Sequence, residues 1–334
     1  MVVRNFTCRY PNNKEPQNVT QPSEFHLLQL SEDPDLQPII FGLFLSRYLV
    51  TVLGNLLIIL AVSSDSHLHT PFFLSNLSST DTCFISTMVP KMIFVDIQTH
   101  SRVISYVGCQ TQMSLFIIFG CMDDMLLTVM AYGCFVAICH PLHYSVILNP
   151  CLCVSLVLMS FLVSLLNSLL HNLIVLQFPH FKDVEIANFF CDPSQLLNIS
   201  CSDAFTNNIV MCFVVTISGL LPISGISFSY YKIISSILRI PSLGGKYKTF
   251  STCGSHLAVV CLFYGTGFGV YLGSAVSTSP RKGAVASVMY TVVTPMLNPF
   301  IYRLRNKDVR STLRKLHSSS LVSGPVVSIL EYSS

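Results

Sequence analysis

Long apolar runs alternate with short polar stretches from residue 39 to residue 302 of the chain. A helix that crosses a membrane needs roughly 20 predominantly apolar residues. In lipid, only helices and closed barrels pair all of their backbone polar groups, and runs of this length fit helices. We therefore predict seven transmembrane helices, at Ile39–Val62, Phe72–Ile93, Cys109–Ile138, Leu152–Leu176, Phe205–Leu238, Phe250–Gly273 and Val285–Tyr302.

The composition agrees with this pattern, because 51% of the 334 residues are hydrophobic and only 10% are charged. Soluble domains carry about 25% charged residues. The predicted fold is an all-α membrane protein, a seven-transmembrane helix bundle over residues 39–302, with polar tails at 1–38 and 303–334. The first 38 residues lack the apolar core of about 7–15 residues that a cleavable signal peptide needs. The first helix is therefore expected to direct insertion.

Basic residues and glycosylation motifs indicate the orientation. With the N-terminus outside, ten of the 19 lysines and arginines lie inside, eight lie outside, and Arg47 lies within the first helix. Lysine and arginine favour the cytoplasmic side. Two N-x-Thr motifs, at Asn5 and Asn18, add to this, because glycans are attached on the lumenal side. We predict an extracellular, glycosylated N-terminus and a cytoplasmic C-terminus, where the basic residues from Arg303 to about His317 form either a short amphipathic helix on the membrane or a solvated tail.

Three acidic residues fall inside predicted helices, where a charge costs about 2.5–3.5 kcal/mol and usually faces the bundle interior. Asp81 and Asp123 lie at a similar depth, roughly 13 and 16 Å from the cytoplasmic ends of their helices at about 1.5 Å per residue. Two carboxylates at one depth repel unless a cation or a proton lies between them. Either a cation site or one protonated aspartate accounts for the pair. Asp124 is turned by about 100° from Asp123 and has no predicted role.

Six blocks of sequence, in order along the chain, carry a family resemblance that covers about residues 18–308. They read GNLLIILAV from Gly54, LHTPFFLSNLS from Leu68, VAICHPLHY from Val136, FSYYKIISSIL from Phe228, KTFSTCGSHLAVV from Lys248 and PMLNPFIYRLRNKDV from Pro295. In these blocks the chain resembles an olfactory receptor of the rhodopsin-like G-protein-coupled class, and their sequence is similar to that of family 7.

The resemblance implies a plasma-membrane receptor and not an enzyme. Such a receptor binds small volatile or apolar odorants between the outer halves of its helices, and signals through an olfactory, stimulatory heterotrimeric G protein to adenylyl cyclase. The only cofactor implied is an allosteric sodium ion at Asp81 and Asp123, with Asn298 and Asn55 as further candidates. The alternative class is a transporter or channel, but its inverted repeats, broken helices and charged pore rings are not visible in the sequence. No nucleic-acid partner is expected.

The resemblance also assigns a disulfide and a ligand site. It pairs Cys109, at the outer end of the third helix, with Cys191 in the long outer loop. The family's second loop bridge has its later cysteine at Cys201, but no earlier partner near His180. An apolar ligand needs a concave site lined by aliphatic and aromatic groups; the alternative is that each candidate only packs against its neighbours. The predicted ligand-binding residues are Met113, Phe116, Ile117, Gly120, Tyr264, Gly267 and Tyr271.

One stretch departs from the family where the G protein is expected to bind. The family usually has Asp-Arg-Tyr or Asp-Arg-Phe at this place, whereas the chain has Gly133-Cys134-Phe135. A cysteine does not replace a guanidinium, so coupling is expected to be impaired, and a non-signalling receptor-like protein is the alternative function. The further switch residues implied by the resemblance are Tyr230, Pro299 and Tyr302.

Two further departures concern the first two helices. After Pro71 the chain is two residues shorter than the family pattern, so the second helix starts rotated by about 200° unless the loop adjusts. We expect Asp81 to face inward only if the loop adjusts. Arg47 stands where the family has an apolar residue, and it either extends outward to water or hinders insertion.

Overall fold

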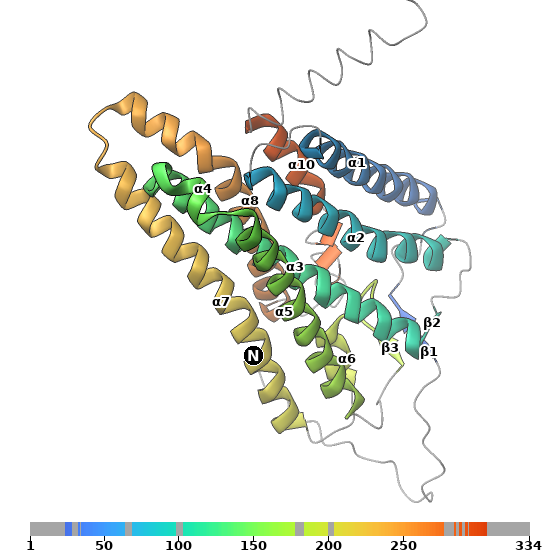
Figure 1. Ribbon diagram of the computed structural model, residues 1–334. Helices are drawn as coiled ribbons and strands as arrows, with labels where there is room; N and C mark the ends of the chain where they lie inside the picture. The colour runs from blue at the N-terminus through green and yellow to red at the C-terminus, as the bar shows by residue number, and fades with distance from the viewer. Residues whose placement is uncertain are drawn as a thin grey trace, which may run out of the picture.

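The computed structural model describes residues 24–28, 33, 35–63, 69–97, 103–177, 184–199, 204–276, 284, 287–288, 291–292 and 294–305. All seven predicted apolar runs coincide with helices, the last of them over its described part (Figure 1). These helices are α1 (Gln37–Ser63), α2 (His69–Ile97), α3 (Tyr106–Cys139), α5 (Pro150–Leu176), α7 (Ala204–Leu238), α8 (Leu243–Val276) and α10 (Thr294–Arg305). The shorter helical elements are η1 (Pro141–His143), α4 (Tyr144–Ile147) and α6 (Pro193–Ile199).

The outside of the bundle is apolar. Helices α1, α3 and α5 are long and apolar enough to cross a membrane. Large apolar side chains point outward from α1, α5 and α7, among them Leu53, Leu166 and Leu220, which are 59, 65 and 60% exposed. Helices that are apolar on their outer faces as well as their inner ones are typical of membrane spans, whereas soluble proteins seldom expose large apolar patches. The described helices therefore fit a multi-pass membrane protein.

Helix α3 is the central element of the bundle. It contacts α2, α5, α7 and α8, whereas α1 packs on α2 and α10 (Figure 1). The hydroxyl of Ser105 caps the first turn of α3 by accepting a hydrogen bond from the N–H of Gly108 at 3.1 Å. Asn149 caps α5 in the same way, and Pro150 occupies the first helical position, where its missing N–H costs nothing. These caps fix where α3 and α5 begin.

Glycines permit two close approaches between helices. A Cβ on Gly54 of α1 would lie 3.1 Å from Cβ of Pro299 in α10. A Cβ on Gly225 of α7 would lie 2.8 Å from Cγ2 of Thr128 in α3. Both distances are shorter than the optimal contact of about 3.5–4.0 Å between carbon atoms. Small residues therefore allow these backbones to come together, as is common between helices in membranes.

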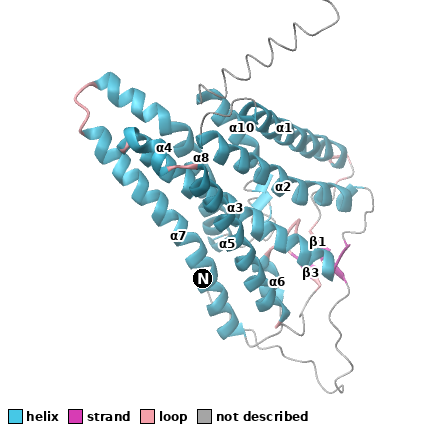
Figure 2. Cartoon of the chain, in the orientation of Figure 1, coloured by secondary structure: helices cyan, strands magenta, loops and turns pink. Residues whose placement is uncertain are grey.

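A small sheet covers one end of the bundle. Its strands are β1 (Glu24–Leu27), β2 (Val103–Ser105) and β3 (Glu185–Ile186). The middle strand is β1, which runs antiparallel to β2 and parallel to β3. Figure 2 shows β1 and β3 together at one end of an otherwise helical bundle. The sequence predicts a separate polar tail for residues 1–38, whereas the structure packs Glu24–Leu27 onto the bundle.

The two ends of the bundle carry different predicted sites. We call the end that holds Cys109 and Cys191 the disulfide end, and the end that holds Gly133-Cys134-Phe135 the junction end. Helix α2 begins at His69, so Pro71 lies in its first turn, where a missing N–H is tolerated. The side chain of Asp81 is only 1% exposed. The shortened segment before α2 therefore does not turn Asp81 away from the interior.

Candidate functional site

Two carboxylates and an amide from three helices meet around a small interior cavity. The side-chain N–H groups of Asn298 in α10 donate to Oδ1 and Oδ2 of Asp81 in α2, at 3.2 and 3.0 Å. The cavity has room for about one water molecule, since the volume that the centre of a water can occupy is about 10 Å³. The residues that line the cavity are Leu77, Asp81, Phe84, Gly120, Asp123, Leu127, Phe263, Thr294, Pro295 and Asn298.

Two oxygens of this cluster lack a hydrogen bond. Oδ1 of Asp123 and Oδ1 of Asn298 are buried and have no partner among the residues that the structure describes. An unpaired buried polar atom costs about 1–3 kcal/mol, and more when the group is charged. Carboxylate and amide oxygens are the donors that hard cations prefer. The predicted set of Asp81, Asp123 and Asn298 therefore fits a cation, whereas Asn55 does not line the cavity.

Asp124 lies beside Asp123 but has a partner of its own. The hydroxyl of Tyr264 in α8 donates a hydrogen bond to Oδ1 of Asp124 in α3. The carboxylate is buried, at 8% exposure. The ring of Tyr264 lies edge-on to Phe263, with 5.3 Å between the ring centres. This contact joins α3 to α8 near the middle of the bundle, and it gives Asp124 the role that the sequence does not supply.

The predicted ligand-binding residues do not gather in one place. Met113 and Ile117 are buried in an apolar cluster at the disulfide end, and Phe116 packs against it. Gly120 instead lines the cavity at Asp81 and Asp123. Gly267 is half-buried on α8, and the side chain of Tyr271 lies outside the described residues. We call the apolar group the disulfide-end cluster; its members are Phe25, Leu27, Ile104, Cys109, Met113, Ile117, Ile174, Val175, Ile186, Cys191 and Leu196.

The loop between α5 and α7 is attached to α3 twice at the disulfide end. Cys109 and Cys191 are joined by a disulfide, with their Cα atoms 5.4 Å apart. The backbone N–H of Cys191 also donates to Oε1 of Gln112, at 3.2 Å. Three predicted or candidate residues of this face, Asn5, Asn18 and Cys201, lie outside the described residues.

The junction end is held by apolar contacts. Cys134 packs against the same hydrophobic cluster that contains Cys253 of α8, and both thiols are free. The ring of Phe135 lies edge-on to that of His140, with 5.6 Å between centres. A Cβ on Gly133 would lie 3.9 Å from Leu148, which is ordinary contact. Gly133-Cys134-Phe135 therefore presents no cation to a partner, although position 133 has room for a larger side chain.

A polar network ties three helices together in the junction half. The hydroxyl of Tyr230 in α7 lies 2.8 Å from Nδ1 of His256 in α8, and Nε2 of His256 lies 2.9 Å from the carbonyl oxygen of Leu127 in α3. Because a carbonyl only accepts, Nε2 carries a proton, and in the neutral imidazole Nδ1 then accepts from the tyrosine hydroxyl. The same hydroxyl lies 3.3 Å from the carbonyl oxygen of Cys253. Of the other two predicted switch residues, Pro299 is buried against α1, and the side chain of Tyr302 lies outside the described residues.

Comparisons with known proteins decide the family. A family model described as olfactory receptor matches residues 44–319. The chain belongs to the olfactory receptor family. It is similar to olfactory receptor 7E178 of Mus musculus, with 70% identity over 315 residues that cover 94% of this chain and 95% of that protein. It is also similar to olfactory receptor 7E24 of Homo sapiens (72% over 314 residues, 93% and 92%) and to olfactory receptor 7D4 of Homo sapiens (60% over 306 residues, 91% and 98%).

These matches confirm the predicted resemblance, including its likeness to family 7. The chain thus belongs to a family of receptors that are not enzymes, and its apolar helices fit a multi-pass membrane protein. The receptor also contains contacts that the sequence reading assigns no role, at Asp124, His256 and Phe25. An ionisable side chain inside an apolar run is itself a signal of function. This signal could have identified Asp124 and His256 from the sequence. No comparable signal marks Phe25, because it stands in a polar segment.

Proposed function

We propose that this odorant receptor crosses the plasma membrane seven times, with its N-terminus outside and residues 303–334 in the cytoplasm. It binds a small volatile or apolar ligand at the disulfide end and acts on a heterotrimeric G protein, and through it on adenylyl cyclase, at the junction end. The observation that carries this proposal is the family match over residues 44–319. It is supported by the buried apolar cluster at the disulfide end, which contains the predicted ligand-binding residues Met113 and Ile117.

The polar contacts of α8 suggest how the two ends communicate. Tyr264 binds Asp124 of α3, and two turns further toward the junction end, His256 binds the backbone of the same helix. A ligand that moves α8 away from α3 breaks both contacts and loosens the network through which His256 also holds Tyr230 of α7. Helices α7 and α8 therefore change position relative to α3 on activation.

A sodium ion fits this proposal as an allosteric ligand. The ion supplies the positive charge that two neighbouring carboxylates need in a low-dielectric interior. Asp81, Asp123 and Asn298 hold it, so it links α2, α3 and α10 in one conformation. A conformation that separates these three helices binds the ion less tightly, and sodium therefore favours the resting receptor.

The junction weakens the output of this receptor. The residue that replaces the family's arginine is Cys134, which has no charge with which to bind a G protein. A restored pair, Gly133→Asp with Cys134→Arg, is compatible with the space at position 133, because a Cβ there meets only Leu148 at 3.9 Å.

The test is a cAMP assay in transfected cells over a panel of apolar odorants, with antibody staining of the cell surface. We expect a weak response from the unaltered receptor and a larger maximal response to the same odorants from the restored pair. Cys134→Ala is the matched control, since it removes the thiol without adding a charge, and it should leave the weak response unchanged. If both receptors reach the surface and neither responds to any odorant, the signalling function is refuted, and the non-signalling alternative replaces it.

A further inference from the structure

The strand β1 is the middle strand of the sheet at the disulfide end, although it comes from the polar N-terminal segment. It pairs with β2 on one edge and β3 on the other. Backbone N–H groups of His26 and Leu28 donate to the carbonyl oxygens of Val184 and Asn188, at 2.8 and 2.9 Å. The segment 184–188 leads directly to Cys191 and its disulfide. The N-terminal strand is thus fixed to the loop that is itself fixed to α3.

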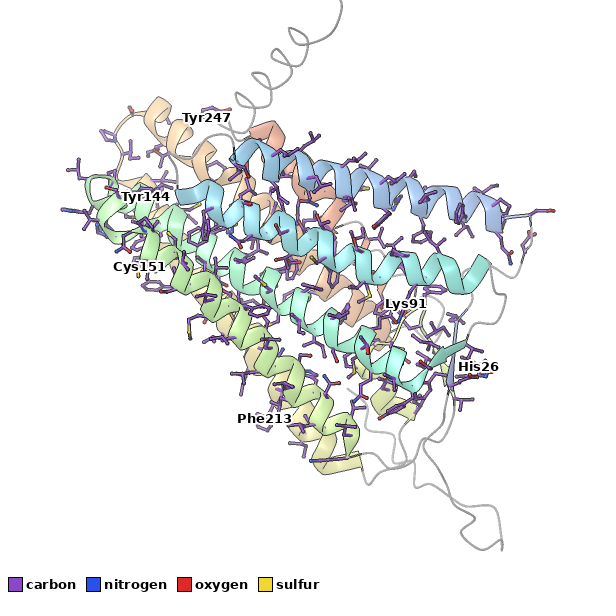
Figure 3. The ribbon with its side chains drawn as sticks, turned by 45° about the vertical axis from the view of Figure 1, so that its right-hand side comes forward. His26, Lys91, Tyr144, Cys151, Phe213 and Tyr247 are labelled. Atoms are coloured by element: carbon purple, nitrogen blue, oxygen red, sulfur yellow. A yellow bond between two sulfur atoms is a disulfide. The ribbon has the colours of Figure 1, made fainter. Side chains whose placement is uncertain are left out.

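Side chains of β1 alternate between the two faces of the sheet, as in any strand. Phe25 and Leu27 face the bundle and are 0 and 7% exposed, whereas Glu24 and His26 are exposed on the other face. Figure 3 shows His26 beside the strands at this end of the bundle. One strand therefore supplies an inward-facing residue and, next to it, an outward-facing residue for comparison.

Phe25 covers the disulfide-end cluster. It belongs to the same buried cluster as Met113 and Ile117 of α3, and its ring centre lies 6.0 Å from that of Tyr106 at the start of α3. Ile174 and Val175 of α5 complete the sides of the cluster. A ligand that contacts Met113 and Ile117 is therefore bounded toward the end of the bundle by the ring of Phe25.

We propose that Phe25 is a specificity-determining residue of this receptor, because its ring forms the end wall of the ligand site and sets the length of the apolar ligand. This inference rests on the proposed function, which places the ligand against the disulfide-end cluster. Removing the ring leaves apolar space next to the ligand. A longer chain can then bury further methylene groups, each of which strengthens binding by about fourfold.

The test measures binding directly and does not depend on G-protein coupling. The purified receptor in nanodiscs is loaded with the fluorescent apolar probe aminoanthracene, which is displaced by straight-chain aldehydes from hexanal to dodecanal. The variants are Phe25→Ala, Phe25→Leu and, as the matched control, His26→Ala on the exposed face of the same strand. We expect Phe25→Ala to bind the longer aldehydes more tightly and the aldehyde preferred by the unaltered receptor more weakly. Phe25→Leu should lie between them, and His26→Ala should reproduce the original order.

The outcomes separate the inference from the function on which it rests. If the unaltered receptor binds a subset of the aldehydes, and Phe25→Ala and Phe25→Leu keep the same order of preference, the ligand site stands and the role of Phe25 is refuted. If Phe25→Ala and His26→Ala change the order alike, the strand acts only as a whole, and the role of the ring is again refuted. If the unaltered receptor binds neither probe nor aldehyde, the proposed ligand site fails, and the inference fails with it. Phe25→Leu keeps an apolar side chain at this position, so it supplies the comparison if Phe25→Ala does not fold.

Discussion

Replacing Tyr264 by phenylalanine removes one hydroxyl from the interior and leaves the ring in place. The lost contact is a hydrogen bond to the carboxylate of Asp124, which is 8% exposed. Hydrogen bonds to charged groups contribute about 1.5–3 kcal/mol in soluble proteins, whereas polar pairs between membrane helices average about 0.6 and reach about 1.7 kcal/mol. Because the acceptor here is a buried carboxylate, we expect a coupling free energy near the upper membrane value, about 1.5 kcal/mol.

A double-mutant cycle measures this coupling. The free energy of unfolding of the purified receptor in detergent is measured for Tyr264→Phe, for Asp124→Leu and for the two combined. We expect Tyr264→Phe to destabilise the receptor when Asp124 is present and to have little effect when leucine replaces it. Asp124→Asn serves as a control, because the amide oxygen still accepts from the hydroxyl, so this variant should keep most of the stability.

Additive effects of the two substitutions would refute the reasoning. Sites that do not interact give additive free energies within about 0.3–0.5 kcal/mol. A coupling below that range means that the contact between Tyr264 and Asp124 does not stabilise the link between α3 and α8. A role for Asp124 would then have to come from another partner.

Three further outcomes are expected. Asp81→Asn should abolish the stabilisation of the receptor by sodium chloride over potassium chloride in thermal unfolding; a salt preference that survives the substitution contradicts the cation site. Gly225→Ala should destabilise the receptor by about 1–3 kcal/mol, because its Cβ would lie 2.8 Å from Thr128, whereas Gly219→Ala has open space and should gain up to about 1 kcal/mol from helix propensity. Tyr230→Phe should raise the ligand-independent cAMP level in the restored-pair receptor, because it frees α7 from α8, and an unchanged basal level at equal surface expression argues against this network as a resting-state contact.

The positions of the helices follow from the sequence because each apolar run is long enough to fit one helix and little else. The six sequence blocks that carry the family resemblance also place the family correctly, since they are spread over most of the bundle. The same reasoning cannot find β1, because Glu24–Leu27 is four residues long and stands in a polar segment. Its conformation comes from partners that lie about 80 and 160 residues further along the chain.

The candidate site divides in a similar way. A shared depth for Asp81 and Asp123 follows from counting residues along two helices, and the structure puts both on one cavity. The contact between Asp124 and Tyr264 depends on the rotation of α8 relative to α3, which helix–helix packing determines and residue counting does not. For that reason Tyr264 is predicted as a ligand contact, whereas in the structure its hydroxyl donates to Asp124.

The order of the strands has a consequence for how the chain assembles during synthesis. The earliest part of the sheet to emerge is β1, but its second partner, β3, ends at Ile186, after α1, α2, α3 and α5 have all been made. Pairings between distant segments form slowly, because a long loop must close first. The N-terminal strand therefore cannot complete its pairing until more than half of the polypeptide has been synthesised. A substitution in the segment around β3 would thus act on a strand about 160 residues earlier in the sequence, because β1 would fail to dock.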